Sequence, residues 1–320
     1  MNEQIAYRRQ TAVGRAGPRS RLLRKIWSYR MLYFMLLPGV VYYIVYRYVP
    51  MYGTIIAFKD FQITEGIVSS PWASPWYKHF QTFYTSPYFS QLLVNTMLIS
   101  LYKLIFGIFP PIALAVLLNE CRLAWYNRLI QTLTYMPYFL SWVIIYGMAV
   151  AFFSESSGIV NKWLKEAGFD SIPFLTSTSW FRSVLVGSDM WQQTGYGAII
   201  YLAAMAGIDP TLYEAARVDG ASRLRMIWHI TLPGVRTVMV LLLILRLGHF
   251  LDAGFEQIYV MYNVQVYQVA DILDTWVFRT GLQQLNFSLA AAVGLFKGFI
   301  GIALVLSANR LARRWGGSIW

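Results

Sequence analysis

The stretch DPTLYEAARVDGASRLRMIWHITLP, residues 209–233, lies between two long apolar segments and predicts two short helices joined by a glycine turn. Asp209 followed by Pro210 is typical of an N-cap with proline at the first helical position. Gly220 lets the chain turn, Ser222 can cap the second helix, and Pro233 is expected to end it where the next apolar segment begins. The stretch is too long for a tight connector, so we expect it to form a feature of its own.

The middle of the first predicted helix carries little side-chain bulk. Ala215 and Ala216 leave its centre open to close approach by another protein, while Glu214, Arg217 and Asp219 place charges around that contact. We therefore predict a helical knob that fits a groove in a partner. A basic linker helix between two spans is the alternative.

The same residues meet every fixed position of a known loop pattern, which reads E-A-A, three residues, G, nine residues, then I-x-L-P. The fixed positions are Glu214, Ala215, Ala216, Gly220, Ile230, Leu232 and Pro233. On this pattern the chain resembles the permease subunits of binding-protein-dependent ABC importers. In that family the loop is a coupling helix that docks in a cleft of a cytoplasmic ATPase. The resemblance implies this role for Glu214, Ala215, Ala216, Asp219 and Gly220.

Outside this loop the composition is that of an integral membrane protein. Of 320 residues, 57% are hydrophobic and 13% are charged, which is outside the usual range of soluble domains. Apolar blocks of roughly 20 residues can cross a bilayer as helices. We expect an all-α protein with the type I ABC importer permease fold and six spans, at about 31–49, 92–118, 130–153, 182–206, 235–259 and 287–308. The first block has no small-residue cleavage site after it, so we expect it to remain as a helix.

The six spans divide the chain into a basic segment over residues 1–30, a permease domain over 31–308 with the coupling loop at 207–234, and a tail over 309–320. The net charge of +12 lies mainly in short segments beside the spans, which is the pattern of positive-inside sorting rather than of nucleic-acid binding. These segments hold Arg8, Arg9, Arg15, Arg19, Arg21, Arg24, Lys25, Arg30, Arg122, Arg128, Arg217, Arg223, Arg225, Arg236, Arg310, Arg313 and Arg314. Both ends are therefore predicted in the cytoplasm, and the family resemblance implies a bacterial inner membrane.

Residues that would support catalysis or metal binding are sparse. Cys121 is the one cysteine, and the three histidines show no metal-ligand spacing, so we predict no metal site and no cofactor in this chain. No P-loop sequence occurs, which places ATP and Mg²⁺ on separate subunits. The rival interpretations are an ion-driven secondary transporter, which usually shows internal repeats, and a membrane enzyme using Asp189, His249 or Asp252, which lacks a catalytic constellation.

Three further segments resemble the carbohydrate branch of the importer family. They are the residues after the first span (50–61), after the third span (158–168) and between the fifth and sixth spans (255–275). Within this branch the chain most resembles the permeases of uptake systems for acidic polysaccharides such as alginate. A substrate of another solute class is the alternative. The resemblance implies a carbohydrate substrate, a second homologous permease subunit in a heterodimer, two ATPase subunits and a solute-binding protein.

Polar and aromatic side chains within the spans are candidates for the substrate path, because unpaired polar groups are costly in lipid. The candidates are Asn95, Tyr138, Trp142, Tyr146, Gln192, Gln193, Tyr196, Arg246, His249 and Asp252. At helical spacing Tyr138, Trp142 and Tyr146 share a stripe with Tyr135. Arg246, His249, Asp252 and Glu256 likewise share one broad face of the fifth span. The alternatives are ordinary packing for the aromatic stripe and a mutually neutralising charge ladder for the charged face.

Two buried-looking cations and a glycine face have structural explanations. Lys103 and Lys297 are expected to pair with neighbouring carboxylates, although an acidic sugar is the alternative partner. Gly294, Gly298 and Gly301 form a small-residue face in the sixth span where another helix can approach closely. That helix could belong to the second permease subunit.

Overall fold

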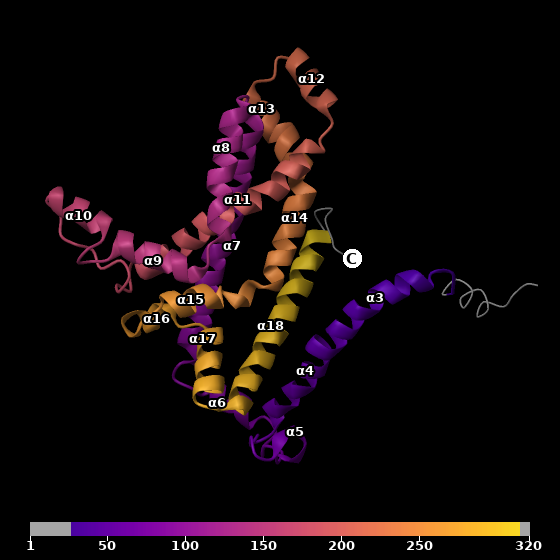
Figure 1. Cartoon of the computed structure of the whole chain (residues 1–320), viewed down its shortest axis with the longest axis vertical. Coiled ribbons are helices and arrows are strands. Elements are labelled where there is room, and N and C mark those ends of the chain that lie inside the picture. Colours follow the sequence, from indigo (N-terminus) through magenta and orange to yellow (C-terminus); the bar gives the residue numbers. More distant parts are fainter. Residues whose placement is uncertain (1–26, 314–320) are drawn as a thin grey trace, which may run out of the picture. The chain divides into compact units, whose positions relative to one another are not determined.

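The computed structural model describes residues 27–313, which are almost entirely helical (Figure 1). In this part of the chain the only strand-like feature is an isolated bridge between Lys59 and Trp72. The chain divides into two compact units, residues 1–55 and 56–320. Most of the predicted basic N-terminal segment and the end of the tail lie outside the described residues.

The described part of the first unit, residues 27–55, is an apolar helix in which no side chain is buried. It comprises α3 (Arg30–Tyr43), the π-helical turn η1 (Ile44–Tyr48), α4 (Val49–Met51) and the start of the 3-10 segment η2 (Tyr52–Phe58). The helical run Arg30–Phe58 is longer than the predicted span at 31–49. It continues past Pro50 because the wider π turn before this proline accommodates its missing N–H.

Two long helices form the centre of the second unit. α7 (Phe89–Glu120) and α11 (Phe181–Ala206) pack side by side, and α14 (Leu232–Gly248) packs against α11. Buried apolar side chains between these three helices form one core cluster, consisting of Ile112, Ala115, Ala198, Tyr201, Met205 and Val235. Two predicted spans are therefore long helices at the expected places.

The predicted third span is not a straight helix. α8 (Ala124–Tyr135) and the 3-10 turn η3 (Met136–Phe139) meet α9 (Trp142–Phe153) at a bend of 107°. Ser141 caps α9 by accepting a hydrogen bond from the Ile144 amide at 3.4 Å. The prediction that Tyr135, Tyr138, Trp142 and Tyr146 share one helical stripe is therefore wrong, because the helix is interrupted between Phe139 and Trp142.

The region around the predicted fifth span differs from expectation at both ends. α12 (Pro210–Val218) is followed by α13 (Arg223–Met226) and the π turn η4 (Ile227–Thr231), which continue into α14 as one helix, Arg223–Gly248. Pro233 was expected to end the second short helix, and this is wrong. Its missing N–H falls at the second position of α14, where the π turn has already changed the hydrogen-bond pattern.

At its other end the helix stops at Gly248 instead of reaching residue 259. The 3-10 turn η5 (Phe250–Asp252) follows, and then Ala253 (φ 47°) and Gly254 (φ 82°) adopt left-handed conformations before α15 (Phe255–Met261). An L-residue with positive φ cannot continue a right-handed helix. The prediction that Arg246, His249, Asp252 and Glu256 occupy one helical face is therefore wrong.

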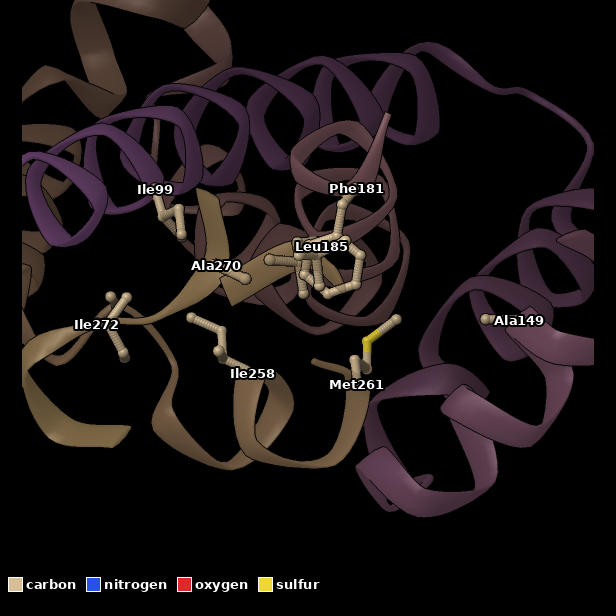
Figure 2. Packing of buried hydrophobic residues seen from close by; sticks show 10 residues of the cluster. Ile99, Ala149, Phe181, Leu185, Ile258, Met261, Ala270 and Ile272 are labelled. Atoms are coloured by element: carbon tan, nitrogen blue, oxygen red, sulfur yellow. The ribbon is translucent and has the colours of Figure 1, made fainter. Parts of the chain in front are cut away.

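The second unit also contains several short helical elements and a final long helix. They are α5 (Gly66–Ser69), α6 (Lys78–Tyr84), α10 (Ile159–Glu166), η6 (Val264–Val266), α16 (Tyr267–Ala270), α17 (Leu273–Phe278), η7 (Arg279–Gln283) and α18 (Phe287–Arg313). One core cluster joins α7, α9 and α11 to the segment 253–272, with Phe181, Leu185 and Ile258 at its centre (Figure 2). A second joins α6 and α7 to α17 and α18.

Within the described residues, four helices are long and apolar enough to span a membrane, or five if the bent pair α8–α9 counts as one span. They are Arg30–Phe58, Phe89–Glu120, Arg223–Gly248 and Phe287–Arg310. α11 is not among them, because side chains such as Arg182, Asp189, Gln192 and Gln193 lower its mean hydropathy. Residues 27–313 therefore form an all-helical structure with several apolar helices.

Candidate functional site

The predicted knob is a separate helix whose two ends are fixed by hydrogen bonds within its own sequence. At the N-terminus of α12, the Asp209 carboxylate accepts a hydrogen bond from the Thr211 amide at 2.9 Å. This bond holds the pKa of Asp209 below its usual value. At the C-terminus Gly220 has φ +74°, and the amides of Gly220 and Ala221 donate to the carbonyls of Arg217 and Ala216. These two bonds form a Schellman motif, which explains why glycine stands there.

The surface of this knob is exposed and carries both charged and apolar side chains. Glu214, Ala215, Asp219 and Gly220 are exposed, and Ala216 is half-buried. Large apolar side chains beside them also face outward: Leu212 (52% exposed), Val218 (89%), Leu224 (70%) and Trp228 (67%). Several exposed large apolar side chains within one short segment are typical of a protein contact site. The sequence pattern identified the alanines but not these larger residues.

Two contacts connect α12 to the start of α14. The Tyr213 hydroxyl lies 2.9 Å from the Oγ1 of Thr231, which is buried in the π turn. The Ile208 side chain packs over Gly234, where an added Cβ would lie 2.7 Å from Ile208 Cδ1. A hydrogen bond from α12 and a close apolar contact just before it therefore link this segment to the start of the long helix. Sequence reasoning missed both contacts, because neither Tyr213 nor Ile208 belongs to the loop pattern.

A cavity of about 480 Å³, which we call the polar cavity because charged and polar side chains make up about half of its lining, lies at the opposite end of α14. It brings together four of the predicted path residues, Gln193, Arg246, His249 and Asp252. The rest of the lining is Ser100, Lys103, Leu104, Asp189, Leu242, Leu245, Phe250, Ala253 and Gly254. The lining therefore comes from α7, α11, α14, η5 and the left-handed pair after it.

The cavity's carboxylates are paired with cations from other helices. Lys103 on α7 lies 3.5 Å from Asp189 on α11 and also donates to the side-chain oxygen of Gln257. Lys297 on α18 lies 2.6 Å from Asp252 and 2.8 Å from Asp274. The expected pairing of Lys103 and Lys297 with neighbouring carboxylates is confirmed. These ion pairs join separate helices and do not form a ladder along one helix.

Two lining groups stand outside these pairs. No carboxylate of the described residues lies within 4.0 Å of Arg246, whose guanidinium occupies the space that Gly107 leaves on α7. The Ser100 hydroxyl is buried and has no hydrogen-bond partner, alone among the buried side-chain polar atoms of residues 27–310. His249 is 82% exposed at the rim and lies 3.0 Å from Asp252.

The other predicted path residues lie away from this cavity. Asn95 is buried and donates to the carbonyls of Gln268 (3.1 Å) and Asp271 (2.9 Å), while its Oδ1 accepts from Arg182 at 2.6 Å. Gln192 is buried as well, and its amide donates to the carbonyl of Leu140 at the bend before α9. Asn95 therefore fixes the segment after α15 onto α7, and Gln192 fixes the bend.

The aromatic candidates separate into a stacked pair and two others. Tyr138 and Tyr196 stack with ring centroids 3.9 Å apart and planes 7° from parallel. Tyr146 packs against the core cluster around Phe181 and also lines a second pocket, of about 530 Å³. Trp142 is half-buried in the first turn of α9. The structure thus separates these rings from the charged cavity.

The glycine face of α18 lines a groove of its own. Gly294, Gly298 and Gly301 have no atom within 4 Å of the position a Cβ would take. Together with Lys297, Asp252 and apolar residues they border a pocket of about 660 Å³. Within the described residues, no group of three or more His, Cys, Asp or Glu side chains is placed to hold a metal ion.

Comparisons with known proteins relate this geometry to a family. Residues 16–316 match the family described as binding-protein-dependent transport system inner membrane component. The polygalacturonan/rhamnogalacturonan transport system permease protein YteP of Bacillus subtilis (strain 168) is 44% identical over 298 residues, which cover 93% of this chain and 92% of YteP.

Two similar solved structures contain a bacterial transporter of an acidic polysaccharide. One is a bacterial ABC transporter involved in the import of alginate, with a TM-score of 0.84 and 39% identity over 92% of this chain and 99% of that one. The other is the bacterial alginate ABC transporter in complex with a periplasmic protein that holds an alginate pentasaccharide. Its TM-score is 0.85 at 38% identity, covering 93% of this chain and 99% of that one.

Proposed function

The chain belongs to the family of binding-protein-dependent transport system inner membrane components, and from this premise we propose that it forms one half of the membrane path of an importer for acidic poly- or oligosaccharides. It is a membrane-embedded permease of an ABC importer for sugars or polysaccharides. That the saccharide is acidic is the more specific part of the proposal, and the relatives that transport polygalacturonan and alginate support it. Another solute class would leave the permease role unchanged.

The observation that carries the coupling mechanism is the placement of α12. It is exposed, capped at both ends, and tied through Tyr213 to the helix whose other end borders the polar cavity. We therefore assign α12 the role of docking helix, with Glu214, Ala215, Ala216, Asp219 and Gly220 facing a cytoplasmic ATPase. Two such ATPases hold ATP and Mg²⁺ and supply the energy, and this chain acts as a transport subunit.

Six spans with both ends in the cytoplasm complete the proposed topology. α8–α9 serves as one bent span and α11 as another. The low hydropathy of α11 fits this assignment, because Asp189 and Gln193 face the polar cavity and Gln192 is buried against the bend. The polar side chains that lower the mean hydropathy of α11 are thus turned away from lipid. The membrane is the bacterial inner membrane.

The proposed assembly contains a second permease, because the cavity is open on the side where His249 is exposed. A homologous permease would cover this side and the glycine groove of α18, giving a heterodimer with an enclosed path. A solute-binding protein delivers the saccharide to the outer mouth. Gln193, Arg246, His249 and Asp252 then line the path, while Asn95, Gln192, Trp142 and the three tyrosines support its walls.

A cross-linking experiment tests the docking role. Cys121 is replaced by serine and Ala215 by cysteine. The assembled complex is treated with a reagent that carries one thiol-reactive and one photoreactive group, irradiated, and analysed by mass spectrometry. We expect a cross-link from residue 215 to an ATPase subunit. Thr178→Cys, an exposed position in the loop between α10 and α11, is the matched control and gives none. Absence of any ATPase cross-link from position 215, with the complex intact, would refute the proposal.

A further inference from the structure

Arg246 is a cation in a membrane-embedded cavity without an anion beside it. The three carboxylates in and next to the cavity are all engaged: Asp189 by Lys103, and Asp252 and Asp274 by Lys297. His249 also contacts Asp252, so this carboxylate has two partners already. Cations within membrane spans are expensive unless paired, so the guanidinium of Arg246 requires a partner that the described residues do not supply.

The position of Arg246 is built into the fold. Its guanidinium lies against Gly107 so closely that an added Cβ there would collide with Nη1. The missing side chain on α7 is therefore what gives Arg246 its place on the cavity wall. A guanidinium presents a planar set of donors that matches a carboxylate in two parallel hydrogen bonds.

The Ser100 hydroxyl gives an independent indication of a ligand. It lines the same cavity, is 95% buried as judged by its 5% relative exposure, and has no hydrogen-bond partner. Buried polar groups are nearly always paired in native proteins, and an exception requires an explanation. A hydroxyl of a bound sugar would donate to or accept from Ser100.

We infer that Arg246 selects anionic sugars in this cavity by binding a uronate carboxylate, while Ser100 and Gln193 bind hydroxyl groups of the same or the adjacent ring. The inference rests on the proposed function and adds a residue that determines specificity. The cavity of about 480 Å³ is within the range of roughly 300–1,000 Å³ that small-ligand sites occupy. It has room for a short segment of a saccharide chain.

The test measures discrimination between charged and neutral cargo by the full complex. The complex of both permeases, both ATPases and the binding protein is reconstituted in vesicles, and uptake is measured for a galacturonate trisaccharide and for its methyl ester, which lacks the charge. We expect Arg246→Gln to lower the acid-to-ester uptake ratio at least tenfold and Arg246→Lys to restore part of it. Arg236→Gln removes an exposed cation from the same helix and should leave the ratio unchanged.

Gly107→Ala supplies a second variant that keeps the charge. Its Cβ displaces the guanidinium, so the ratio should fall in the same direction, by about threefold or more, and this variant decides the matter if Arg246→Gln does not assemble. Ser100→Ala should lower uptake of both cargoes equally. The inference would be overturned if Arg246→Gln and Gly107→Ala left the acid-to-ester ratio unchanged, whether or not they lowered the uptake of both cargoes. If the wild-type complex transports neither cargo, the proposed function itself fails.

Discussion

The two ends of α14 are built in opposite ways. At one end α12 is fixed by residues within a dozen positions, through the cap at Asp209 and the Schellman turn at Gly220. At the other end the cavity is assembled from residues between Ser100 and Lys297, and its ion pairs join different helices. The comparison teaches that the proposed docking end is a local sequence motif, whereas the cavity end is a product of the tertiary fold.

The largest effect should follow from adding bulk at the docking end. Ala215→Trp places an indole on the exposed face of α12 and should block docking, so that uptake falls to near background while the isolated chain stays folded. Ala215→Ser, which is nearly as small as alanine, should transport normally. Uptake assays and co-purification of the ATPase measure both variants. Normal uptake by the tryptophan variant would show that α12 is not a docking surface, and the contrast between the two ends of α14 would no longer hold.

A substantial loss of stability is expected from the buried network beyond the cavity. Asn95→Ala removes three hydrogen bonds and leaves the Asp271 carbonyl buried without this donor, which costs about 3 kcal/mol. Gln91 lies one helical turn before Asn95 and makes a single hydrogen bond, to the Tyr267 carbonyl. Gln91→Ala should therefore lower the stability less than Asn95→Ala. The thermal unfolding midpoint of the detergent-solubilised complex measures both. An unchanged midpoint together with a raised KM for the saccharide would instead assign Asn95 to the substrate path.

A smaller and strictly local effect is expected at Gly220. Its φ of +74° costs an alanine about 1–2 kcal/mol, although open space surrounds the new Cβ. Gly220→Ala should therefore accelerate amide hydrogen exchange at Ala221 by roughly tenfold while leaving the cavity helices unaffected. Gly207→Ala, at a residue with negative φ, is the control. Faster exchange throughout α14 would show that the two ends are not independent in stability.

The smallest effect concerns an exposed ion pair outside both regions. The hydrogen bond from Lys78, with further contributions from its charge and from His79, lowers the pKa of Asp60. A lowered folded-state pKa stabilises the protein above the unfolded pKa of about 4, and this stability is lost as the pH falls through the lower folded value. Asp60→Asn should remove this acid-dependent part, amounting to less than about 1 kcal/mol because the pair is exposed. Thermal unfolding between pH 3 and pH 6 would detect it, and an identical pH profile in the variant would contradict it.

Sequence reasoning succeeded where the determinants are local. The cap at Asp209, the turn at Gly220 and the cap at Ser222 are encoded by adjacent residues, so all three were predicted correctly. It failed where the helix path depends on tertiary contacts. The apolar pattern of the sequence continues through both the break after Gly248 and the bend at residues 139–142. It therefore predicted a continuous helix at each of these places.

The charged cavity was predictable only in part. Gln193, Arg246, His249 and Asp252 were selected because polar side chains in a span need partners, and the fold does bring these four together. Ser100, Gly107 and Gln257 carried no such signal, since a serine, a glycine and a glutamine are ordinary residues in any helix. Gly107 and Gln257 act through contacts with residues far away in the sequence, and Ser100 is notable only for the partner it lacks in the fold, none of which one sequence reveals.

The continuous helical run from Arg223 to Gly248, which includes the π turn η4, also has a mechanical consequence. At a rise of about 1.5 Å per residue it is about 38 Å long. Acting as a lever, it would turn a tilt of about 5° at the inner end into a sideways travel of about 3 Å at the outer end, roughly the length of one hydrogen bond. A small movement of the ATPase, too small to repack any core, would thus suffice to form or break hydrogen bonds to a sugar in the cavity.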